Sequence, residues 1–97
     1  MSVTVTALSE EFYGGTNLTR FIQKRVRAVL VTEATITAAE LDLTNLVSVT
    51  SGFDADTDEV VPLAIDAAGT SILIADPADG STGVAISGDL YFTVSGD

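Results

Sequence analysis

The sequence contains no cysteine, no histidine and no tryptophan among its 97 residues. Without cysteine, no disulfide can stabilise the fold and no thiolate can bind a metal or attack a substrate; this fits a reducing compartment. Without histidine, the commonest general base and the commonest transition-metal ligand are both missing. There is also no Gly-rich phosphate loop and no nucleophile beside a plausible base. We therefore expect a protein that is not an enzyme and uses no cofactor.

Basic residues are scarce as well. The chain has 4 Lys and Arg against 14 Asp and Glu, a net charge of −10, and a pI near 4.1. Nucleic acids and anionic membranes are polyanions, so neither is expected as a partner. No apolar run approaches the about 20 residues of a membrane span, and the start has no signal-peptide pattern. We expect a soluble protein that is made in the cytoplasm.

Apolar residues, in contrast, are abundant. They make up 46% of the chain, and the mean hydropathy is +0.42. Disordered acidic segments are poor in Val, Ile and Leu, so this composition indicates a folded chain. The length suits one domain with a thin core. The high hydropathy indicates either a dense aliphatic core or apolar surface that another chain covers.

Short stretches of alternating or β-branched residues recur along the chain. Residues 2–7, Ser-Val-Thr-Val-Thr-Ala, alternate strictly, as a half-buried strand does. Six or seven short strands at intervals of about ten residues predict an all-β fold, mainly an antiparallel sandwich or barrel. The strands are expected at 2–7, 24–32, 45–50, 60–65, 71–75, 84–87 and 90–95.

Four details refine this pattern. The apolar residues of 17–31 also fit one helical face, but β-branched residues near its end favour a strand over 24–32. The segment "TAAE", Thr37 to Glu40, is a capping-box pattern that predicts a short helix through Leu43. Pro62 makes 60–65 an edge strand or a bulged one. In the last strand Tyr91 and Phe92 face opposite sides, so one should be in the core and the other exposed or covered by a partner.

The first residues are expected to form an arm. The pair Gly14-Gly15 marks a turn or hinge, which separates a possibly mobile or partner-pairing arm, residues 1–15, from a single β-rich domain, residues 16–97. Val3 and Val5 are candidate contacts to a partner. Phe12 and Tyr13 either cover the end of the sandwich or anchor an interface, where aromatic residues are enriched.

The acidic segment "DADTDE" resembles the opening of a calcium loop. Asp54, Asp56 and Asp58 have the right spacing. However, Glu59 stands where such a loop needs glycine, and Ile65 stands where it needs a bidentate carboxylate. We therefore favour a solvated acidic loop, with these three residues as a weak candidate calcium site and no other metal ligands.

All four bases lie within eight consecutive residues: Arg20, Lys24, Arg25 and Arg27. From Ala28 to Asp97 there are twelve acids and no base. One interpretation is that the bases pair with acids of their own chain on neighbouring strands. The other is that Arg20, Arg25 and Arg27 face acids of a second subunit, which would relieve repulsion between acidic copies and fix their register.

Three stretches resemble the capsid decoration, or cement, proteins of tailed bacteriophages. They are the "VTVT" start, the segment "ITAAELDLTNLVSV" and the closing strand "GDLYFTVSGD". The resemblance implies a structural protein, often a homotrimer, that binds the major capsid protein on the outer surface of the virion and stabilises the shell. It also implies an N-terminal arm that reaches a neighbouring subunit.

A function of another class remains open. The predicted β-domain is also compatible with an adhesin-like or carbohydrate-binding module that holds a weak calcium ion in its acidic loop. Calorimetric titration with calcium separates the two, since micromolar affinity would favour this alternative.

Overall fold

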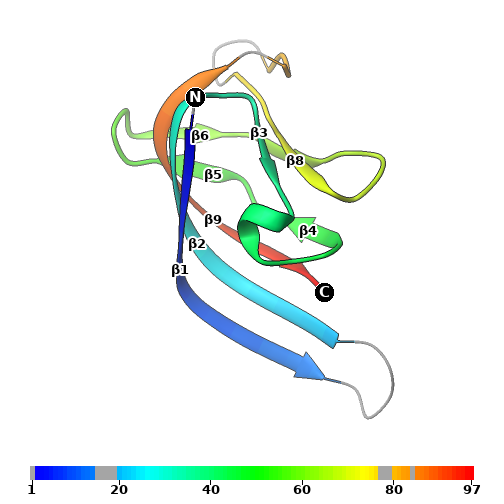
Figure 1. The fold of residues 1–97 in the computed structure, drawn as a ribbon. Coiled ribbons are helices and arrows are strands. Elements are labelled where there is room, and N and C mark those ends of the chain that lie inside the picture. The colour runs from blue at the N-terminus through cyan, green and yellow to red at the C-terminus, as the bar shows by residue number, and fades with distance from the viewer. Residues whose placement is uncertain (1, 15–19, 77–79, 84) are drawn as a thin grey trace.

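The structure is a computed structural model that describes residues 2–14, 20–76, 80–83 and 85–97. The chain is built almost wholly from strands (Figure 1). In chain order the elements are β1 (Ser2–Gly14), β2 (Arg20–Glu33), β3 (Thr35–Thr37), the 3-10 turn η1 (Ala39–Leu41), β4 (Leu46–Val49), β5 (Gly52–Asp54), β6 (Glu59–Val61), β7 (Leu63–Ile65), β8 (Ser71–Ile74) and β9 (Ile86–Gly96).

The strands form two antiparallel sheets. The large sheet has the order β1-β2-β9-β5-β6, and β4 pairs with the end of β9. The small sheet has the order β3-β8-β7. The β1–β2 hairpin is long enough to extend past the rest of the molecule (Figure 1). The expected all-β class, an antiparallel arrangement of two sheets with one short helical element, is confirmed.

The core lies between the two sheets and follows the two-residue period of the strands. Along β2, alternate residues from Ile22 to Leu30 are buried, and along β9 the buried alternate side chains include Phe92. The preceding residue, Tyr91, is half-buried. It faces the opposite side of the sheet from Phe92, as the alternation predicted. The core consists of Ile22, Val26, Ala28, Leu30, Ile36, Ala38, Leu41, Leu43, Leu46, Val61, Ile72, Ile74, Leu90, Phe92 and Val94.

Pro62 marks the point where the chain leaves one sheet for the other. The predicted strand 60–65 is two strands: β6 ends at Val61 in the large sheet and β7 begins at Leu63 in the small one. A proline has no backbone N–H to donate to a ladder, so a crossing between sheets is a favourable place for it. Its carbonyl still accepts the N–H of Ala75 at 3.0 Å.

The described residues contain nine strands, and three of them are long, with 13, 14 and 11 residues. The expectation of six or seven short strands is therefore wrong in number and length. Residues 52–54, expected as loop, form β5, and the two strands expected at 84–87 and 90–95 are one. Gly88, inside β9, leaves room for the carboxylate of Asp54, because a Cβ at this position would lie 2.5 Å from Oδ2 of Asp54.

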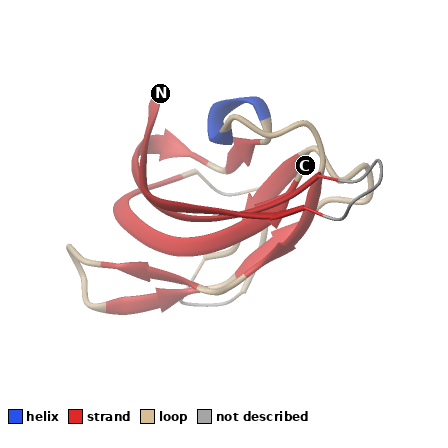
Figure 2. Cartoon of the chain, turned by 90° about the horizontal axis from the view of Figure 1, so that it is seen from below, coloured by secondary structure: helices blue, strands red, loops and turns tan. Residues whose placement is uncertain are grey.

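The capping box at Thr37 is formed. Thr37 donates its backbone N–H and its hydroxyl to Oε1 of Glu40 at 3.0 and 2.9 Å, and its hydroxyl oxygen accepts the N–H of Glu40 at 3.3 Å. The helix that follows is only η1, because Asp42 adopts a left-handed conformation with φ 58° and ends it. Figure 2 shows this single helical turn among strands and loops. Within the described part of the chain no helix is long and apolar enough to cross a membrane.

The N-terminal segment is part of the large sheet. Residues 2–14 pair with β2 along their whole length, with one register shift between Ala7 and Ser9. Val3 and Val5 pack against the core. Of the predicted turn or hinge Gly14-Gly15, Gly14 is the last residue of β1 and pairs with Arg20, and Gly15 lies outside the described residues.

Candidate interaction surface

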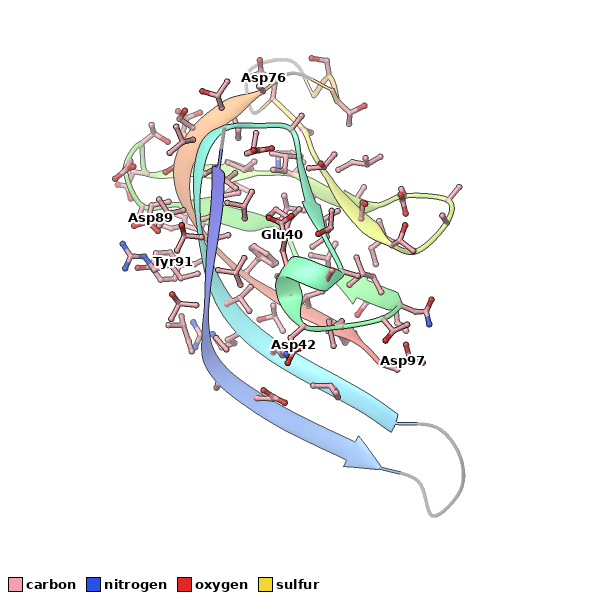
Figure 3. The ribbon with its side chains drawn as sticks, viewed as in Figure 1. Glu40, Asp42, Asp76, Asp89, Tyr91 and Asp97 are labelled. Atoms are coloured by element: carbon pink, nitrogen blue, oxygen red, sulfur yellow. The ribbon has the colours of Figure 1, made fainter. Side chains whose placement is uncertain are left out.

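One cross-strand row of side chains spans the outer face of the large sheet, the face turned away from the small sheet. The pairing register aligns Thr6 of β1, Arg27 of β2, Tyr91 of β9, Phe53 of β5 and Val60 of β6. Figure 3 shows the side chain of Tyr91 beside that of Asp89, away from η1 and the small sheet. Aromatic, apolar and basic groups from five strands thus share one surface.

This row and the neighbouring Leu8 of β1 carry exposed apolar side chains. Phe53 is 42% exposed, Val60 62% and Leu8 49%. Leu8, Arg25, Phe53 and Tyr91 help to line a shallow hollow of about 390 Å³ on this face. Clustered apolar exposure on a small protein indicates a binding surface. We call this surface the outer patch; it consists of Leu8, Arg25, Arg27, Phe53, Val60 and Tyr91.

Arg27 is paired within its own chain. Its Nε and Nη2 donate to the two carboxylate oxygens of Asp89 at 2.8 and 2.9 Å. Its guanidinium lies 5.9 Å from the centre of the Tyr91 ring, within the range of a cation–π contact. The two hydrogen bonds and then the charge of Asp89 raise the pKa of Arg27 above its ordinary value. For this residue the structure supports pairing within the chain.

Lys24 lies on the opposite face of β2 from Arg25 and Arg27. It is 4% exposed, and its Nζ donates to the carbonyl of Leu41 at 2.9 Å. Carboxylate oxygens of Glu10 and Asp42 lie 3.9 and 4.0 Å from the same nitrogen. Lys24 therefore fastens the β1–β2 hairpin to η1 and is not part of the outer patch.

Arg25 is the basic group that remains for a partner. Its side chain is exposed, and no carboxylate among the described side chains forms an ion pair with it. Arg20 is the first residue of β2 and pairs with Gly14, but its side chain lies outside what the structure describes. Among the described side chains, the basic cluster thus divides into a buried ammonium (Lys24), an internal ion pair (Arg27) and one exposed guanidinium (Arg25).

The acidic loop does not assemble its carboxylates around a common point. Asp54 is 5% exposed, and its Oδ1 accepts the N–H of Asp56 at 2.9 Å and that of Asp89 at 3.3 Å. Asp56 and Asp58 are exposed. No group of three or more His, Cys, Asp or Glu residues in the described ranges could hold a metal ion. Asp54 shapes the turn between β5 and β6 instead.

The other predicted interface residues have different locations. Val3 and Val5 face their own core and are half-buried. The side chains of Phe12 and Tyr13 lie outside the described set. Sequence reasoning missed Leu8, Phe53 and Val60. Phe53 offers one signal, an aromatic residue beside an acidic turn, but β5 has only three residues, too few for alternation to predict a strand there.

The ion pair of Arg27 predicts a pH dependence. Hydrogen bonds from Arg27 hold the pKa of Asp89 below its ordinary value, although desolvation opposes the shift. A lowered folded-state pKa stabilises the protein above the unfolded pKa of about 4, and this contribution is lost as the pH falls through the folded pKa. We expect Arg27→Gln to raise the pKa of Asp89, measured by carboxyl NMR titration. An unchanged titration would contradict the pairing.

A scan against protein-family models finds no matching family, and neither curated proteins nor solved structures provide a match to this chain.

Proposed function

We propose that the protein is a structural, non-catalytic subunit that decorates the outer surface of a bacteriophage capsid and stabilises the shell. The outer patch is the observation that carries this proposal. It presents exposed Phe53, Val60 and Leu8 next to an exposed arginine on an antiparallel sheet. Exposed apolar groups beside an arginine are typical of surfaces that bind another protein.

The chemistry of the chain agrees with a structural role. The sequence lacks histidine and cysteine. Its one buried ammonium, among the side chains described, donates to a backbone carbonyl. The proposed partner is the major capsid protein, and the homotrimer implied by the sequence resemblance is part of the proposal.

The test is binding to capsid shells. Shells assembled from the major capsid protein of the same genome should retain the purified protein in saturable co-sedimentation, and should melt at a higher temperature with it. Val60→Ser should weaken binding by about tenfold, because the side chain lies in the apolar part of the outer patch. Val47→Ser is the matched control: Val47 of β4 is 63% exposed, against 62% for Val60, and does not belong to the patch.

Two outcomes would overturn the proposal. The first is wild-type protein that does not sediment with the shells. The second is equal binding by the Val60→Ser and Val47→Ser variants, which would exclude the outer patch as the contact. Binding to a glycan without binding to shells would instead support the adhesin-like alternative.

A further inference from the structure

The outer edge of β1 is open over a long stretch. β1 has 13 residues and, within the ranges that the structure describes, pairs with β2 alone. Across the described residues, no backbone hydrogen bond joins β1 to any other segment. Its outward N–H and C=O groups therefore form a row that another strand can bind.

The first half of this edge also lacks the usual protection. Residues 2–8, Ser-Val-Thr-Val-Thr-Ala-Leu, contain no charge and no proline. Sheets commonly guard such edges with lysine, proline or very short strands. The opposite edge of the large sheet follows that rule, since β6 has only three residues and begins at Glu59. The contrast singles out the start of β1.

We infer that two copies of this chain pair through residues 2–8 of β1, antiparallel about a two-fold axis at Val5. In this register Val5 faces Val5 of the second copy and Thr4 faces its Thr6. The valines stay on the core side and the threonines on the outer side, so both large sheets join into one. The inference goes beyond the proposed function, because it concerns the isolated protein and needs no capsid.

Charge selects both the partner and the register. In a chain of net charge −10, the uncharged window can lie against its own copy without placing acid against acid. Moving the axis toward the far end of β1 would bring Glu10 and Glu11 of the two copies together, and like charges directly opposite each other are destabilising. The register shift between Ala7 and Ser9 separates the uncharged half from these acids.

Sedimentation equilibrium of the full chain tests this inference. The wild-type oligomer should contain an even number of chains. It should be a dimer or, if the trimer also forms, two trimers joined across the two-fold axis. Thr4→Lys/Thr6→Lys places lysines opposite each other and should weaken the pairing at least about tenfold. Thr4→Lys/Thr6→Glu places Lys opposite Glu at both symmetric positions, so its association should stay within about threefold of wild type. Both threonines are exposed, so the fold should tolerate either change.

A second measurement needs no variant. Amide hydrogen exchange of residues 3–7 should slow as the wild-type concentration rises, because pairing buries the outward N–H groups. A monomer or a trimer at every concentration would overturn the inference. So would equal association of the two double variants, or exchange that does not depend on concentration.

Discussion

Leu90→Ala should lower the free energy of unfolding by about 2–5 kcal/mol. Leu90 is fully buried and belongs to the core cluster. It lies on β9, which pairs with β2 on one side and with β4 and β5 on the other. Its direct neighbours in the register are Ala28 and Asp54. Because β9 is paired on both sides, the backbone around Leu90 cannot easily shift to fill the cavity that the substitution leaves. Most of the lost packing energy should therefore be lost from the free energy of unfolding.

Urea denaturation followed by circular dichroism measures this change, and Val47→Ala provides the control. Val47 is 63% exposed, so its truncation should change stability by no more than about 0.5 kcal/mol. A loss below about 1 kcal/mol for Leu90→Ala would mean that β9 does not form the centre of the core. The m-value should be the same for wild type and Leu90→Ala, since both expose nearly the same surface area on unfolding.

Local pattern predicted much of the fold. The alternation in the last strand correctly predicted that Tyr91 and Phe92 face opposite sides; the structure shows that Phe92 is the core residue and that Tyr91 is half-buried on the other face. The capping box was recognised from Thr37 and Glu40 alone, because its bonds join residues three apart. The role of Pro62 was half predicted: β6 and β7 on either side of it are both edge strands, as expected, but its position between two sheets depends on the whole topology.

The interaction surface could not be predicted in the same way. The outer patch is assembled by register between strands far apart in sequence. Arg27 and Asp89, which form its internal ion pair, are separated by 62 residues. Nothing in the basic segment itself shows that Lys24 is buried under η1 while Arg25 is exposed. Alternation gives the face of each residue, but only the fold determines whether that face meets the core or the solvent.

Lys24 illustrates why charge segregation along a chain is ambiguous. A lysine on the inner side of a sheet contradicts a simple apolar pattern, yet its ammonium reaches the Leu41 carbonyl and lies near two carboxylates. Buried polar groups need such partners. Two members of the basic cluster, Lys24 and Arg27, therefore bind groups of their own chain and support the fold. Among the side chains described, only Arg25 has an exposed charge without an ion pair.

Arg25→Glu should consequently weaken assembly. We expect about tenfold weaker binding to capsid shells at low ionic strength, because the proposed partner surface is acidic: either carboxylates of a capsid subunit or the loop Asp54 to Glu59 of a neighbouring copy. The difference should shrink at high salt, since the Debye length is about 8 Å at physiological ionic strength and shorter above it. Association kinetics at several salt concentrations measure both effects.

Two further variants make this test specific. Arg25→Gln removes the charge without reversing it and should show an intermediate loss. Arg27→Glu is a poorer probe, because it places a carboxylate beside Asp89 and should loosen β2 from β9 as well as remove a basic group. Since Arg25 is exposed and the described residues offer it no ion pair, Arg25→Glu should leave the melting temperature nearly unchanged. If it binds shells like wild type at every ionic strength, the exposed guanidinium is only solvated, and Arg25 does not steer assembly.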